Sequence, residues 1–253
     1  MRIAAISDIH GNLAALDAVL ADIARRDVDM IVNLGDIVSG NLQPSATAAR
    51  LMALDLPTIA GNHERQLLGD PVRMGISDRY AREQLLPQQL AWIAALPATL
   101  RLMDDASDVL LVHGTPSSDL VYFLDTVTPQ GSRAATTDEV LERAGTAQAS
   151  LILCGHTHMP RSVALPDGRL IVNPGSVGLP AYGDDHGYAH VMENGTPHAR
   201  YAIVERRQQG AWSAQFHAVE YDWEAAALLA LANGRPDWSV PLRTGRVGVA
   251  HGF

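Results

Sequence analysis

The chain has 253 residues, a hydrophobic content of 47% and a formal net charge of −9, so it can build one sizeable core or two small domains. The acidic balance without any basic run argues against long DNA or RNA as a partner. All 19 cationic side chains are arginines, which excludes a P-loop lysine, a pyridoxal Schiff base and a lysine nucleophile.

The first polar cluster follows an apolar run at residues 3–6, which predicts a buried strand. Residues two apart in a strand point to the same face, so we expect Asp8 and His10 to project together from the strand's C-terminal end. Ligands of α/β sheets bind at such ends, and a carboxylate beside an imidazole indicates a metal site. The alternative is a plain capping turn, with Asn12 as the N-cap of the next helix.

A second strand brings another carboxylate to the same place. Residues 13–26 have helical apolar spacing, and residues 29–34 read as a buried strand that ends before Asp36. Strand, helix and strand form a βαβ unit, which makes the two strands parallel neighbours. Asp36 should therefore emerge beside Asp8 and His10, unless it only caps a helix.

The third cluster follows a helix predicted at residues 44–54 and a short strand at 56–60. Asn62 supplies a neutral amide oxygen and His63 an imidazole that can carry a proton. Glu64 is interpreted as a support for the following helical turn rather than as a ligand.

Two further strand ends carry histidines. A hairpin of residues 100–103 and 109–112, turning at 104–108, ends at His113, and a buried strand at 150–154 runs into His156 and His158. Cys154 lies inside that apolar strand and is interpreted as an inert core thiol. Residues 115–130 carry two prolines and an apolar cluster, which is typical of a lid or rim loop.

The remaining chain predicts one more hairpin, several strands and a helix, followed from about residue 233 by a tail over the surface. No linker or internal repeat divides the sequence, so residues 1–253 are expected to form a single domain. The expected elements are a helix at 137–144, hairpin strands at 161–165 and 169–172, strands near 188–192, 199–205 and 212–219, and a helix at 223–231.

Five separate strand ends thus carry polar clusters, in the order Asp-x-His, Gly-Asp, Gly-Asn-His-Glu, His-Gly and Gly-His-x-His. This ordered pattern resembles the calcineurin-like metallophosphoesterase superfamily over most of the chain. Residues 173–177, Asn-Pro-Gly-Ser-Val, look like the compact bacterial phosphodiesterase branch, which also contains diadenosine polyphosphate hydrolases.

The resemblance implies an α/β (α+β) fold, a four-layer α-β-β-α sandwich of two mixed sheets with two metal ions at the strand ends. It also implies a phosphoesterase that works by attack of a metal-bridging hydroxide. His63 would stay off the metals and face the scissile phosphate as the catalytic residue. Carried across, one metal would bind Asp8, His10 and His158, the other Asn62, His113 and His156, and Asp36 would bridge both.

The residue types agree with such a site. Imidazoles, carboxylates and an amide without any thiolate suit Mn, Fe, Zn, Co or Ni better than Ca or a structural zinc, and we expect Mn. Two divalent ions would outweigh the two ligand carboxylates, so the site would attract a phosphate although the chain is acidic.

The leading interpretation is a dinuclear metal-dependent phosphoesterase acting on a small phosphodiester or nucleotide. Alternatives are a nucleotide phosphomonoesterase, a dinucleoside polyphosphate hydrolase, or a non-catalytic scaffold such as some members of this superfamily. A scaffold would tolerate loss of ligands, yet all seven and His63 are present. The single cysteine, the direct start in a strand and the lack of a long apolar run predict a cytoplasmic protein without a membrane partner.

Several other polar residues lie outside these five clusters. The loop at residues 182–186 could line the cleft, and Arg161 could contact a substrate phosphate or remain solvated. The remaining histidines are interpreted as surface or satisfied core residues: His186, His190, His198, His217 and His251.

Overall fold

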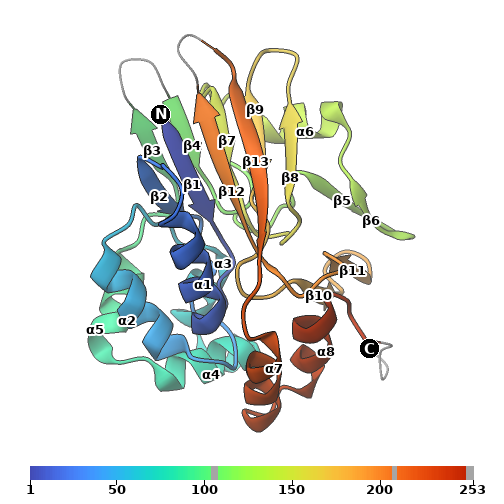
Figure 1. Cartoon of the computed structure of the whole chain (residues 1–253). Helices are drawn as coiled ribbons and strands as arrows, with labels where there is room; N and C mark the ends of the chain where they lie inside the picture. Colours follow the sequence, from blue (N-terminus) through green and yellow to red (C-terminus); the bar gives the residue numbers. More distant parts are fainter. Residues whose placement is uncertain (104–107, 207–209, 249–253) are drawn as a thin grey trace.

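The computed structural model describes residues 1–103, 108–206 and 210–248. Two mixed sheets pack face to face, with helices on their outer sides (Figure 1). This arrangement is the expected four-layer α-β-β-α sandwich.

The first sheet has the strand order β13-β12-β1-β2. Strand β1 pairs in parallel with β2, placing Ile3 opposite Met30, and antiparallel with β12. The expected βαβ unit is therefore present, with α1 as its crossover. The bounds are β1 Arg2–Ile6, α1 Leu13–Ile23, β2 Met30–Asn33, β12 Ala199–Arg206 and β13 Trp212–Val219.

The second sheet has the order β3-β4-β7-β9-β8, with β4, β7 and β9 parallel and both edge strands antiparallel. Both predicted hairpins, β3–β4 and β8–β9, are present, although residues 104–107 of the first turn lie outside the described residues. The bounds are β3 Leu100–Met103, β4 Asp108–Leu111, β7 Leu151–Leu153, β8 Arg161–Ala164 and β9 Leu170–Asn173.

The helices cover the outer faces of the two sheets or close the polar end of the sandwich. Helices α1 and α2 pack on the first sheet over one shared buried apolar cluster. Helix α6 packs on the second sheet over another. The other helix bounds are α2 Pro44–Leu54, α3 Asn62–Leu67, η1 Pro71–Arg73, α4 Ile76–Gln84, α5 Pro87–Ala95, α6 Thr137–Ala144, α7 Trp223–Ala232 and α8 Pro236–Thr244.

Three expectations need correction. Residues 236–244 are not a surface tail, because they form α8 and bury Trp238 and Leu242. The strand expected at 56–60 is reduced to an isolated bridge between Thr58 and Asn33.

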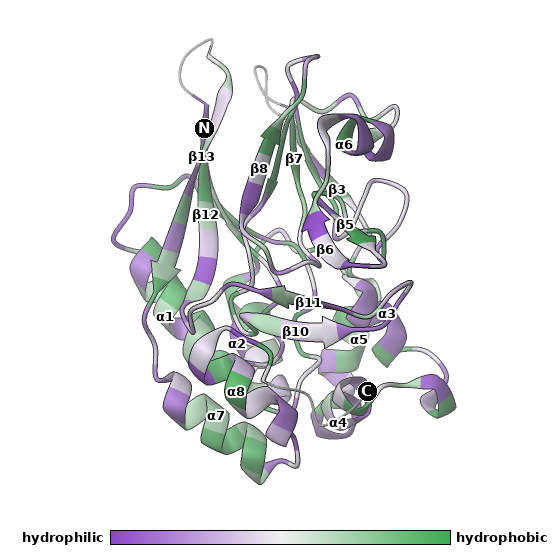
Figure 2. Cartoon of the chain, turned by 90° about the vertical axis from the view of Figure 1, so that its right-hand side faces the viewer, coloured by the Kyte–Doolittle hydropathy of each residue, from purple (hydrophilic) through white to green (hydrophobic). Residues whose placement is uncertain are grey.

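The stretch at 115–130, expected to be a loop, ends in a strand that forms a hairpin with the next segment, β5 (Asp125–Thr128) with β6 (Gly131–Ala134). A second small hairpin, β10 (Ala181–Asp184) with β11 (His190–Glu193), lies between the sheet ends and α8 (Figure 2). None of the helices in the described ranges is both long enough and apolar enough to cross a bilayer.

A fully buried apolar layer joins the two sheets. Ile3, Ala5 and Val32 of the first sheet belong to one cluster with Val109 and Leu151 of the second. The strands are short, so this layer fixes where each strand ends, and it thereby fixes the positions of the polar residues that follow.

We expect Ile3→Ala to lower the free energy of unfolding by about 2–5 kcal/mol, because truncating a buried isoleucine removes apolar contacts and leaves a cavity. Ile3 is fully buried between the sheets. Urea titration followed by circular dichroism measures the change. Met103→Ala is the matched control, since its side chain is 72% exposed on β3. Equal stability of the two variants would contradict an intersheet core at this position.

Candidate metal centre

The polar residues after the strands adopt an unusual backbone conformation. Among the described residues, the expected ligands Asp8, His10, Asp36, His156 and His158 all have φ between 52° and 70°. Non-glycine residues rarely adopt this left-handed region, and strained residues of this kind cluster at functional sites.

Asp8 and His10 lie close together, but they do not belong to a strand as expected. Strand β1 ends at Ile6, so left-handed turns, rather than strand alternation, bring the two side chains together.

The first cluster contains Asp8, His10 and His158. The Nε2 atoms of the two histidines lie 3.0 Å apart, and His158 Nε2 lies 3.4 Å from an Asp8 carboxylate oxygen. His10 Nδ1 donates to the Ser39 carbonyl at 2.8 Å, and His158 Nδ1 donates to the Leu179 carbonyl at 2.7 Å. A neutral imidazole that donates through Nδ1 has a lone pair on Nε2, so the lone pairs of the two rings face each other. A cation shared by both Nε2 atoms would stabilise this arrangement.

The second cluster contains Asp36, His113 and His156, with Asn62 beside them. His113 Nε2 lies 3.1 Å from Asp36 Oδ2 and 3.1 Å from Asn62 Oδ1. Its Nδ1 contacts the Leu34 carbonyl at 2.7 Å, which directs Nε2 toward the two oxygens. A carboxylate, an amide oxygen and imidazole nitrogens form a donor set that fits a divalent transition metal.

His156 completes the pattern of fixed imidazoles. Its Nε2 contacts the Leu120 carbonyl at 3.0 Å, and its backbone N–H donates to the Asp8 carboxylate. All four histidines therefore have one ring nitrogen held by a backbone carbonyl, which leaves the other nitrogen available for a metal.

Burial and neighbouring charges shift the pKa values of three cluster imidazoles, in opposite directions. Burial and the neighbouring His158 lower the pKa of His10 to about 3, and burial and His113 lower the pKa of His156 to about 4. Burial opposes a charge on His113, but the Asp36 carboxylate outweighs burial and raises the pKa of His113 to about 10. The Asp36 carboxylate therefore stabilises a positive charge placed next to it, whether that charge is a proton on His113 or a metal ion.

Glu64 supports the first turn of α3, as expected from the sequence, and it also supports the backbone around Asp36. Its carboxylate accepts hydrogen bonds from the N–H groups of Asp36, Ile37 and Gly61, each at 2.8 Å. Gly61 is needed here because a Cβ at this position would lie 2.2 Å from Asp36 Oδ1.

His63 lies beside the clusters and belongs to neither of them. Its Nδ1 is 2.8 Å from Asp78 Oδ1, and the Ser39 hydroxyl donates to the same oxygen at 2.6 Å. Burial disfavours protonated His63, but the carboxylates of Asp36 and Asp78 outweigh burial and raise its pKa to about 9. Sequence reasoning missed Asp78, because no motif marks this residue in α4.

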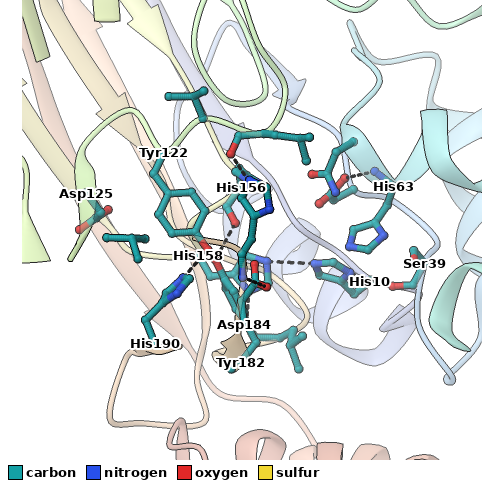
Figure 3. A pocket seen from close by; sticks show the side chains of 18 of the residues that line it. His10, Ser39, His63, Tyr122, Asp125, His156, His158, Tyr182, Asp184 and His190 are labelled. Atoms are coloured by element: carbon teal, nitrogen blue, oxygen red, sulfur yellow. Dashed lines mark hydrogen bonds between the residues drawn. The ribbon is translucent and has the colours of Figure 1, made fainter. Parts of the chain in front are cut away.

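A cavity of about 710 Å³ opens onto both clusters. Figure 3 shows His63 and Ser39 on one side of it and Asp125 on the other, with His156 and His158 between them. Tyr182, Asp184 and His186 line the cavity, as expected for that loop, and Leu120 and Tyr122 line it from the predicted rim.

His190 is a buried histidine with both ring nitrogens in hydrogen-bond contact, and His186 is exposed, so both agree with the expected core or surface placement, although both also line the cavity. The Tyr122 hydroxyl lies 3.0 Å from His190 Nε2 and 2.7 Å from the Tyr182 hydroxyl. These contacts tie the rim segment to the β10–β11 hairpin.

Arg161 forms an ion pair with Asp125 at 3.1 Å and does not line the cavity, so the structure gives no support for a contact with substrate phosphate. His198 lies 4.0 Å from Glu220, and His217 stacks on Tyr201, which agrees with structural roles. His251 lies outside the described residues.

Helix α8 contributes a wall that the sequence did not indicate. The Trp238 ring meets the His10 ring edge-on at 6.1 Å and packs against Gly40, whose missing side chain leaves room for it. Arg235 lies 4.9 Å above the same indole. Trp238 therefore positions a candidate metal ligand from the C-terminal segment.

The sandwich fold and two clusters of metal-ligating groups in one cavity define a metal-dependent phosphoesterase. The model of the calcineurin-like phosphoesterase superfamily domain matches residues 1–195, and the chain belongs to this family. It is an enzyme that hydrolyses phosphoric ester bonds.

Similar proteins cover almost the whole chain. A metallophosphoesterase structure from Sphaerobacter thermophilus is 28% identical, with a TM-score of 0.71 over 96% of this chain and 98% of that chain. A hypothetical protein from Pyrococcus horikoshii shares the fold at 18% identity, with a TM-score of 0.76 over 97% of this chain and 98% of that chain. An uncharacterised protein from Methanocaldococcus jannaschii is 27% identical over 93% of this chain and 94% of its own length.

We expect Asp78→Ala to lower kcat/KM by less than His63→Ala, for which a loss of about 10²–10⁴-fold is typical of a proton-transfer residue. The reason is that Asp78 acts through the orientation and protonation of His63. The double variant should therefore be no slower than His63→Ala alone. Kinetics of the four proteins test this, and additive losses would show that Asp78 acts independently of His63.

We expect Trp238→Ala to weaken metal binding at the Asp8–His10–His158 cluster about tenfold, because partners behind a ligand orient it. Metal titration by calorimetry measures the effect. Val240→Ala, on the same helix with a 43% exposed side chain, is the control. Unchanged affinity in Trp238→Ala would remove the positioning role.

Proposed function

We propose that the protein is a dinuclear metal-dependent phosphoesterase that hydrolyses a small phosphodiester or a nucleotide phosphate. The observation that carries this proposal is the set of four imidazoles, each held by a backbone carbonyl and each part of a cluster with a carboxylate. The clusters adjoin, because His113 Nε2 lies 4.0 Å from an oxygen of Asp8.

In this proposal one metal site comprises Asp8, His10 and His158, and the other comprises Asn62, His113 and His156. Asp36 serves both sites as a bridge. Divalent cations bound there would supply an activated water and stabilise negative charge on the phosphoryl group. Manganese is the first metal to test, because the ligands include no thiolate.

His63 is proposed to help the leaving oxygen. Asp78 holds Nδ1, which leaves Nε2 as the nitrogen that can donate a proton toward the cavity. The raised pKa of His63 supports this role, since a protonated imidazole is the donor that a departing alkoxide needs.

The size of the site favours a small substrate. The cavity volume of about 710 Å³ falls within the range of about 300–1,000 Å³ typical of small-molecule sites. A nucleotide phosphomonoester or a dinucleoside polyphosphate would also fit this description, and they are the alternatives to a simple diester.

A substrate panel tests the proposal. Purified protein loaded with Mn²⁺ would be assayed against phosphomonoesters, phosphodiesters, cyclic nucleotides and dinucleoside polyphosphates, before and after removal of metal with a chelator. We expect turnover of at least one class and its loss on chelation, with recovery when metal returns. A protein that binds two metals but turns over none of these would instead support a non-catalytic scaffold.

The His63 role makes a separate prediction about leaving groups. A nitrophenolate departs readily, whereas a ribose alkoxide is much more basic and needs a proton. We therefore expect His63→Ala to slow a nucleoside phosphodiester more than a nitrophenyl ester, with a gap of up to about 10²–10⁴-fold. Measurements of kcat/KM at matched metal occupancy decide it, and equal losses on both substrates would rule out proton donation.

A further inference from the structure

The cavity continues past the metal-ligand clusters to a second polar wall. Asp125, Thr126, Val127 and Arg143 line this end, and Figure 3 places Asp125 on the side opposite His63. The Thr157 hydroxyl, between His156 and His158 in sequence, donates to the Asp125 carboxylate at 3.1 Å. This wall therefore adjoins the loop that carries two of the expected ligands.

Arg143 is held in this wall by neutral groups. Its Nη1 donates to the carbonyls of Phe123 and Asp125 at 3.1 and 2.9 Å, and its Nη2 donates to the Thr126 hydroxyl at 2.7 Å. These contacts fix the guanidinium in place without neutralising its charge. A guanidinium has five N–H donors, so some remain for a ligand.

The carboxylates near Arg143 are either paired with other arginines or exposed to solvent. Asp125 is paired with Arg161 at 3.1 Å, and Glu139 forms a two-pronged ion pair with Arg133. Glu142, the preceding residue in α6, is exposed and does not line the cavity. No ion pair joins Arg143 to a carboxylate in the part of the chain that the structure describes.

The other cavity-lining arginine differs in this respect. Arg235 is paired with Asp237 at 2.7 Å, so its charge is compensated. Within the described cavity wall, Arg143 is thus the guanidinium without a carboxylate partner. A fixed, half-buried and uncompensated guanidinium is suited to bind phosphate oxygens.

We propose that Arg143 forms a second anion subsite, which binds a further phosphate group of the substrate while the scissile phosphate occupies the metal-ligand clusters. The substrate class is then a phosphoester that carries a second phosphate, such as a nucleoside bisphosphate derivative or a dinucleoside polyphosphate. This inference rests on the proposed function, because the clusters define where the scissile group lies.

Matched ligands that differ in one phosphate test the subsite. One pair is thymidine 5′-monophosphate and thymidine 3′,5′-bisphosphate, whose binding to Mn-loaded protein is measured by calorimetry. The other pair is thymidine 5′-(p-nitrophenyl phosphate) with and without a 3′-phosphate, compared by kcat/KM. We expect the second phosphate to improve both quantities about tenfold or more in the wild type.

In Arg143→Gln, the ratio between the ligand with the second phosphate and the ligand without it should fall to near one, both for affinity and for kcat/KM. Val127→Asp, which leaves Arg143 and its hydrogen bonds in place, should reduce it likewise by adding a carboxylate to the same wall. Arg50→Gln is the control, because it removes the same charge from an exposed ion pair with Asp17 outside the cavity lining, and it should keep the preference.

The outcomes separate the subsite from the proposed function. A wild-type preference near one, a preference that survives both Arg143→Gln and Val127→Asp, or an equal loss in Arg50→Gln would overturn the subsite. If the bisphosphate binds more tightly through Arg143 but neither ester is hydrolysed, the subsite stands and the phosphodiesterase proposal fails. If the simple ester is hydrolysed without any preference, the proposed function stands and the subsite fails.

Discussion

The site depends on left-handed backbone turns directly after buried strands. Strands β1, β2 and β7 carry the chain to one edge of the sandwich, and a residue with positive φ follows each of them within a few positions. A residue in a sparsely populated backbone region costs about 1–3 kcal/mol, so surrounding contacts must hold it there. The intersheet core supplies this restraint for the strands, and Glu64 supplies it around Asp36 through three backbone hydrogen bonds.

The sequence was sufficient to predict which residues meet at this edge. Short apolar runs followed by polar residues marked five expected strand ends. Four of them follow strands in the structure, the fifth follows the isolated bridge at Thr58, and Asp8, His10, His113 and their partners come together there. The pattern was readable because each polar cluster is local in sequence and each strand is apolar throughout. The conformation of the clusters was not readable in this way, since strand alternation was assumed at Asp8 and His10, where the backbone is left-handed.

Residues that act through tertiary contacts were beyond the reach of sequence patterns. Asp78 lies in α4, a polar helix in which no motif distinguishes it from other acidic residues, and only packing places it against His63. Helix α8 was expected to be a tail because Pro236 and Pro241 weaken its helical pattern. Pro236 is compatible with the first helical turn, and burial of Trp238 and Leu242 stabilises the rest.

The proposed metal ligands and one wall of the cavity come from different parts of the chain. All the proposed metal ligands lie within residues 1–195, the segment that matches the family model, whereas Arg235 and Trp238 come from the segment after it. The end of the cavity that carries the proposed ligands therefore lies within the segment matched by the family model, while one of its walls is built from a C-terminal helix. A change in that helix can alter which substrates fit without changing a ligand. It can also disturb His10, because Trp238 packs against its ring. One indole side chain is thus both part of the cavity wall and in contact with a proposed metal ligand.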